Sequence, residues 1–143
     1  MERDFYVYLL EVRCAAISAQ CARESIERAE YNLTRLSTAS TDGVRVDSGG
    51  THYDVIAMRV QSYQAARAGA GKRLHEAVAA LSRFRSELQG CGLGEDEQHI
   101  LWLRHVEGLR ADALAERVGM PLCHAWGMLK DAERVLREYL SGE

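Results

Sequence analysis

The chain has 143 residues, of which 47% are hydrophobic and 27% charged, and a formal net charge of −3. This length and composition suit one folded domain, or a hairpin with a small second unit, and exclude disorder of the whole chain. The longest purely apolar run, residues 5–10, is far shorter than the roughly 20 residues that a membrane span needs. We therefore expect a cytoplasmic protein without a membrane partner.

The four cysteines, Cys14, Cys21, Cys91 and Cys123, do not form the close sequence pairs that metal sites favour. The cytosol would keep them reduced, so we interpret them as packing thiols. His124 follows Cys123 directly, but no further ligand stands at metal-binding spacing. No carboxylate pair or nucleophile-base set stands out either. We expect no metal, no cofactor and no enzymatic activity.

The first segment carries an unbroken heptad pattern of apolar residues and contains no proline. Steps of three and four residues place this pattern on one stripe of a single long helix. The stripe consists of Phe5, Tyr8, Val12, Ala15, Ala19, Ala22, Ile26, Ala29, Leu33 and Leu36. Tyr6, Val7, Leu9 and Leu10 make the start of this helix apolar on its other sides too. We expect that surplus to contact the carboxy-terminal domain or a second copy of the chain.

A second long segment repeats the heptad spacing, with one polar break at Arg67. Its stripe consists of Ile56, Val60, Tyr63, Arg67, Ala70, Leu74, Ala77, Leu81, Phe84 and Leu88. Residues 37–51 between the two segments are rich in Ser, Thr, Asp and Gly, which predicts a loop, and its length favours disorder. We place the start of the second helix near His52. Two matched stripes joined by a loop predict an antiparallel pair of helices.

Small residues should face each other across that pair. In an antiparallel arrangement Ala19 and Ala22 lie opposite residues 67–71, which include Gly69 and Gly71. Close approach of the two backbones would offset the cost of about 1 kcal/mol that each glycine inside a helix carries. The alternative is a hinge or kink at the two glycines.

The last third of the chain has a different pattern. Residues 89–94 are glycine-rich but follow no strand, so we interpret them as a helix end and linker rather than a phosphate-binding loop. Gly119 supplies a left-handed turn, and Pro121 suits the first turn of a new helix. The expected core residues are Ile100, Leu101, Leu103, Val106, Leu109, Leu114, Ala115, Ala125, Leu129, Ala132 and Leu136. Short helices around a glycine turn predict a helix-turn-helix.

Residues 100–109, Ile-Leu-Trp-Leu-Arg-His-Val-Glu-Gly-Leu, resemble the run Val-x-x-Leu-Arg-Tyr-x-Glu-Gly-Leu of sigma-factor region 4. Residues 114–120 continue the resemblance, which covers about residues 96–140. Pro121 stands where that family usually has a Ser or Thr cap, and Ala125 where it has Val or Ile. A long hairpin ahead of such a domain further resembles phage and prophage transcription regulators of the ArpU and RinA type.

The expected fold is all-α, with a long antiparallel helical hairpin over residues 1–90, its loop at 37–51, and a sigma region 4-like helix-turn-helix domain at 95–143. The resemblance implies a DNA-binding phage or prophage transcription regulator. It also implies double-stranded DNA as partner and RNA polymerase as a second candidate partner. The bare apolar start of the chain favours a homodimer.

The resemblance places six residues of the last helix toward the DNA groove: Leu122, Cys123, Trp126, Gly127, Lys130 and Asp131. Only Lys130 among them is a cation, whereas sigma domains commonly have Arg, Lys, Gln or Glu at these positions. From Gly94 onward six Arg and Lys residues stand against ten acids, and an acidic domain binds phosphate poorly. The predicted DNA-binding residues are Leu122, Cys123, His124, Trp126, Gly127, Lys130, Arg110 and Arg134.

Other interpretations of these patterns stay open. Six cations of the second long segment could follow a DNA backbone, or they could form a solvated face that pairs with nearby acids. These are Arg59, Arg67, Lys72, Arg73, Arg83 and Arg85. One alternative function is a protein-interaction module, for RNA polymerase or self-association, in which exposed Leu122 and Trp126 anchor a partner. Another is a phage DNA-packaging adaptor similar to small terminases.

Overall fold

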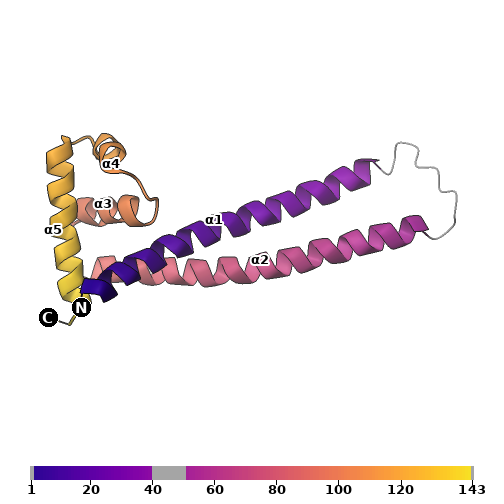
Figure 1. Cartoon of the computed structure of the whole chain (residues 1–143), viewed down its shortest axis with the longest axis horizontal. Coiled ribbons are helices and arrows are strands. Elements are labelled where there is room, and N and C mark those ends of the chain that lie inside the picture. Colours follow the sequence, from indigo (N-terminus) through magenta and orange to yellow (C-terminus); the bar gives the residue numbers. More distant parts are fainter. Residues whose placement is uncertain (1, 40–50, 143) are drawn as a thin grey trace. The chain divides into compact units, whose positions relative to one another are not determined.

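The computed structural model describes the backbone of residues 2–39 and 51–142 and the side chains of residues 4–35 and 54–142. Every regular element in these ranges is an α-helix, as predicted (Figure 1). The helices are α1 (Glu2–Ala39), α2 (Thr51–Gly90), α3 (Glu95–His105), α4 (Ala111–Val118) and α5 (Leu122–Leu140). In the described part of the chain, no helix has a stretch long and apolar enough to cross a membrane.

The chain divides into two compact units. Unit 1 consists of Met1–Ile17 and Ala77–Glu143, and unit 2 consists of Ser18–Glu76. Unit 1 therefore contains the start of α1, the end of α2 and all of α3, α4 and α5. Unit 2 contains the remaining parts of the two long helices.

Both predicted stripes are confirmed over their described residues, except at Ile56, which is exposed. On α1 every stripe residue from Phe5 to Leu33 is buried or half-buried. On α2 only Ile56 and the polar break at Arg67 are exposed. The heptad spacing thus identifies the buried side of each long helix, because residues three and four apart share one face.

The contacts within each unit run antiparallel. In unit 1 the hydroxyl of Tyr8 donates a hydrogen bond to the carboxylate of Glu87, and its ring lies 6.1 Å from that of Phe84. In unit 2, residues 25–33 of α1 and 59–66 of α2 line a common groove. Early residues of one helix therefore meet late residues of the other.

The small residues that are most buried in the described part of unit 2 are alanines rather than glycines. Ala19, Ala22 and Ala70 are almost completely buried, at 1% exposure or less. A β-carbon added at Gly69 or Gly71 would meet no atom within 4 Å. The prediction that these glycines permit close backbone approach is therefore wrong, since neither faces a neighbour at close range. The α-helix continues through both.

Two predictions fall on residues that the structure does not describe. Most of the predicted loop at residues 37–51 lies outside the described ranges, and so do the side chains of Leu36 and His52. The backbone of α2 begins at Thr51, next to the predicted start at His52.

The carboxy-terminal helices cover part of the apolar surplus at the start of α1. Leu9 is buried in the same hydrophobic core as the main side chains of α3, α4 and α5. Tyr6, Val7 and Leu10 keep 50%, 46% and 63% of their surface exposed. We expected the carboxy-terminal domain or a second copy of the chain to cover these four side chains. The carboxy-terminal helices bury Leu9 but leave much of Tyr6, Val7 and Leu10 exposed.

The three short helices enclose the core that the sequence predicts. Gly119 ends α4 with φ 70° and ψ 32°, a left-handed conformation that favours glycine. Pro121 stands directly before α5 as its cap, one position earlier than the predicted first turn. The predicted core residues are buried, except for half-buried Leu109: Ile100, Leu101, Leu103, Val106, Leu114, Ala115, Ala125, Leu129, Ala132 and Leu136.

The cysteines do not behave as predicted. All four are free thiols, but Cys14, Cys21 and Cys123 are exposed, so the interpretation as packing thiols is wrong for these three. Cys14 and Cys21 lie outside the buried stripe of α1, and Cys123 lies on the open side of α5. Only Cys91 is half-buried, and its Sγ donates a hydrogen bond to the Leu88 carbonyl oxygen at 3.2 Å.

Candidate functional site

The outer face of α5 carries most of the predicted DNA-contacting residues. The buried side of this helix holds Ala125, Leu129, Ala132 and Leu136, which leaves the remaining positions of its first turns outside. Arg110 lies on another element, as the cap of α4. All eight predicted residues are exposed: Leu122, Cys123, His124, Trp126, Gly127, Lys130, Arg110 and Arg134. The structure thus leaves this set accessible to a macromolecule.

The starts of α4 and α5 have no side-chain cap. Neither Arg110 before α4 nor Pro121 before α5 accepts a hydrogen bond with its side chain from the first turn. The first backbone N–H groups of a helix lack partners inside the helix and carry its positive end. Such ends suit an anion such as a phosphate group.

Acidic neighbours reduce the positive potential of this face. The Lys130 Nζ lies 3.5 Å from Glu133 Oε2, and the Arg134 Nη2 lies 4.0 Å from Asp131 Oδ1. Both pairs join residues three apart on α5. Any binding of a polyanion here depends on few cations, so it should be weak, and its affinity should fall only gradually with salt.

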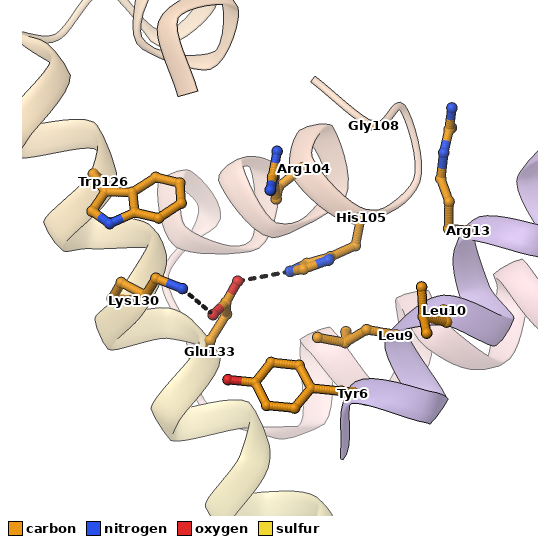
Figure 2. A pocket seen from close by; sticks show the side chains of 10 residues that line it. All are labelled: Tyr6, Leu9, Leu10, Arg13, Arg104, His105, Gly108, Trp126, Lys130 and Glu133. Atoms are coloured by element: carbon orange, nitrogen blue, oxygen red, sulfur yellow. Dashed lines mark hydrogen bonds and ion pairs between the residues drawn. The ribbon is translucent and has the colours of Figure 1, made fainter. Parts of the chain in front are cut away.

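A pocket of about 390 Å³ adjoins the same helix, within unit 1 (Figure 2). Helix α1 contributes apolar side chains and one arginine, α3 and the following loop contribute polar groups, and α5 closes the opposite side. The lining residues are Tyr6, Leu9, Leu10, Arg13, Arg104, His105, Gly108, Trp126, Lys130 and Glu133. Two of them, Trp126 and Lys130, also belong to the predicted DNA-contacting set.

Glu133 is the buried charged group of this pocket, with 6% of its surface exposed. Its Oε1 lies 2.9 Å from His105 Nε2, and its Oε2 faces the Lys130 ammonium (Figure 2). Burial by itself raises the pKa of Glu133, but the hydrogen bond and charge of His105, together with Lys130, outweigh it and lower that pKa below its ordinary value. The carboxylate therefore stays ionised and ties α3 to α5.

Sequence reasoning missed Glu133 as a site residue. Two features of the sequence could have indicated a buried, paired role for Glu133. It stands three residues after Lys130, and it lies between Ala132 and Leu136, which are both on the buried side of the helix. The partner His105 is 28 residues away. Local periodicity does not identify a contact across that separation.

Two cations lie close to the ring of Trp126. The Lys130 Nζ lies 4.7 Å and the Arg104 Cζ 5.9 Å from the ring centroid. Cations at such distances over an indole ring are attracted by its negative face. These contacts hold the half-exposed indole at the pocket rim, on the side that Figure 2 shows facing Arg104.

Two arginines hold the loop between α3 and α4. Arg13 Nη1 donates to the Val106 carbonyl oxygen at 2.5 Å, and Arg104 Nη1 donates to the Leu109 carbonyl oxygen at 2.8 Å. Gly108 lies between those carbonyls with φ +72°, and a β-carbon there would come within 2.6 Å of Arg13 Cζ. The left-handed conformation favours glycine at this position, and any larger residue would also displace the end of the Arg13 side chain.

The six cations of α2 named above are all exposed. Two of them contact aromatic side chains: Arg85 lies over the Trp102 ring at 4.8 Å, and Arg67 Nη1 donates to the Tyr63 hydroxyl at 3.1 Å. None of the ion pairs within residues 4–35 and 54–142 involves these six residues. They stay a second candidate for contact with a nucleic-acid backbone.

No family model, no curated protein and no solved structure matches the chain. The described side chains include no group of three His, Cys, Asp or Glu that could hold a metal ion. Functional inference therefore starts from the geometry of unit 1 and from the sequence pattern around Gly119.

Proposed function

We propose that the chain is a DNA-binding transcription regulator of the phage or prophage type, which contacts double-stranded DNA through a sigma region 4-like helix-turn-helix. The observation that supports it most is the α4–Gly119–α5 arrangement, with a left-handed glycine corner between two helices. In a helix-turn-helix the second helix lies in the major groove and its first residues reach the base edges. Helix α5 would occupy that place.

The exposed residues divide into two kinds of DNA contact. Lys130, Arg134 and Arg110 would contact phosphates, together with the uncapped starts of α4 and α5. Leu122 and Trp126 would contact bases through apolar groups, for which the thymine methyl group is the natural partner. Because base-specific hydrogen bonds normally come from Arg, Lys, Asn or Gln, this set would give modest sequence specificity.

The proposal includes a homodimer in the cytoplasm, with RNA polymerase as a further partner. Val7 and Leu10 leave apolar surface exposed on α1 that a second copy could cover. A dimer would read two half-sites, and the spacing between them follows from the distance between the two copies of α5. The proposal assigns no catalytic role.

A protein-interaction role is the second candidate. Leu122 and Trp126 are exposed apolar residues on α5, and the cations beside them are few and close to acids. Large apolar side chains at a surface commonly anchor protein partners. In that case α5 would bind RNA polymerase, or another copy of the chain, in place of DNA.

Salt-dependent DNA binding by matched variants tests the proposal. A random duplex pool, enriched by repeated selection on the full chain, supplies the DNA. Lys130→Gln and Arg134→Gln should each weaken binding and reduce the slope of log affinity against log salt by about 1. Lys72→Gln, which removes an exposed cation of α2, is the control and should leave the slope unchanged.

Two outcomes would overturn the proposal. A loss of slope in Lys72→Gln alone would assign DNA binding to α2. Retention of RNA polymerase without any enrichment of DNA, and loss of that retention in Trp126→Ala, would favour the protein-interaction role.

A further inference from the structure

We infer that the pocket of unit 1 is a binding site for a small molecule that joins an anionic group, such as a carboxylate, to an apolar body. Its volume of about 390 Å³ lies within the range of small-molecule sites in proteins, roughly 300–1,000 Å³. The pocket is lined by both charged and apolar side chains from helices far apart in the sequence (Figure 2). Each kind of lining specifies one part of the ligand.

The charged lining selects an anion. Arg13, Arg104 and Lys130 are cations, and Glu133 is the one acid among the lining residues. Each guanidinium uses one N–H for a loop carbonyl, at Val106 or Leu109. Since a guanidinium has five N–H donors in a planar fork, donors remain that match the two oxygens of a carboxylate.

The buried acid lowers the positive charge of the lining without reversing it. Glu133 lies inside the pocket and keeps its negative charge, because His105 and Lys130 stabilise the ionised form. Doubling the negative charge of a ligand doubles its repulsion from Glu133 and also its attraction to the three cations, so the lining suits an anionic group of either charge. Both oxygens of Glu133 are already engaged, so the pocket does not offer them to a cationic ligand.

The apolar lining selects the body of the ligand. Tyr6, Leu9 and Leu10 of α1 form one wall, and Trp126 of α5 lies across from them (Figure 2). Tyr6 and Leu10 are at least half exposed. An aromatic or branched aliphatic group between the two walls removes this apolar surface from water.

The site has a consequence for DNA binding that rests on the proposed function. Trp126 and Lys130 line the pocket and also belong to the predicted DNA-contacting set. A carboxylate beside Lys130 neutralises one of the few cations of that face, so occupancy of the pocket weakens DNA binding. The binding site itself does not depend on this consequence and is tested without DNA.

Nuclear magnetic resonance of the isotope-labelled full chain tests the site with phenylacetate. The chain has two tryptophans, and Trp126 lines the pocket whereas Trp102 does not, so the two indole N–H signals give a probe and an internal control. Phenylacetate should shift the Trp126 indole and the Gly108 amide saturably and leave the Trp102 indole in place. Phenylacetamide, the neutral counterpart, should bind more weakly.

Variants connect the binding to the charged lining. Lys130→Gln should weaken phenylacetate binding by up to about fivefold, the effect of losing one partly exposed ion pair. Arg117→Gln removes an exposed cation outside the pocket and should leave binding unchanged. The amide spectrum of each variant shows that the chain still folds.

The inference is overturned if phenylacetamide binds as well as phenylacetate, or if the Trp102 signal moves with that of Trp126. It is also overturned if phenylacetate gives no saturable shift. Absence of DNA binding, by contrast, leaves the phenylacetate result intact and removes only the proposed regulator function.

Discussion

The two units of the chain bury different kinds of side chain. The largest completely buried residues of the described chain all belong to unit 1: Phe84, Ile100, Leu101, Leu103, Leu114, Leu129 and Leu136. Among the described side chains of unit 2, the buried residues are alanines, namely Ala19, Ala22 and Ala70. Since burial of large apolar groups is the main stabilising term, unit 1 should provide most of the free energy of unfolding.

Truncation of one large side chain in each unit should give the largest difference in the free energy of unfolding between the two units. Phe84→Ala in unit 1 should lower the free energy of unfolding by about 3–5 kcal/mol, because it leaves a cavity in a closed core. Leu33→Ala in unit 2 removes a half-buried side chain and should cost about 1–2 kcal/mol. Urea denaturation of the full chain measures both values. Equal losses would show that unit 2 has a core as tight as that of unit 1.

A matched pair of glycine variants sharpens the comparison. Gly108→Ala in unit 1 forces a left-handed conformation and pushes against Arg13, so it should destabilise the chain by about 1–3 kcal/mol. Gly69→Ala in unit 2 meets open space inside a helix and should stabilise it by about 0.5–1 kcal/mol. The two thermal midpoints should therefore move in opposite directions. A loss of stability in both variants would mean that Gly69 has a close neighbour after all.

Acid should weaken unit 1 through Glu133. The pKa of this group is lower in the folded chain than its ordinary value of 4.5, so its contribution to stability is complete above that value. The contribution is lost as the pH falls through the lower, folded pKa, because the unfolded chain binds the proton first. Denaturation of the wild type and Glu133→Gln between about pH 6 and pH 3 should show a steeper loss in the wild type. Parallel curves would contradict the pairing with His105 and Lys130.

Surface changes on α5 should have the smallest effect on stability. Leu122→Ser alters a side chain that is 53% exposed, and such changes usually stay within about 0.5 kcal/mol. If Leu122 contacts a partner, the same variant should still weaken binding to DNA or RNA polymerase. A large loss of stability would instead indicate that Leu122 packs inside unit 1.

Periodicity was sufficient to predict the helices and their buried sides. The stripes of α1 and α2 follow from heptad spacing, and the corner at Gly119 follows from the conformational freedom of glycine. These features depend on residues close together in the sequence. The same local reasoning correctly predicted that α2 ends within residues 89–94 and that a linker follows it.

Contacts between distant residues were beyond sequence reasoning. Arg13 and Val106 are 93 residues apart, and their hydrogen bond depends on how α1 packs against the end of α3. The pairing of His105 with Glu133 likewise depends on packing between α3 and α5. The pocket forms where α1 packs against the end of α3 and where α3 packs against α5, so no single sequence motif predicts it. The misjudged cysteines show the same limit, because thiol burial depends on which side of a helix meets a neighbour.

The order of the units along the chain has an evolutionary consequence. Unit 2 lies along the chain between the two segments of unit 1, which end at Ile17 and resume at Ala77. Because α1 and α2 run antiparallel with the same repeat, equal deletions of whole heptads from both arms would keep their registers matched. Related chains could therefore differ widely in arm length while sharing one terminal domain, and a shortened version is a practical scaffold for engineering.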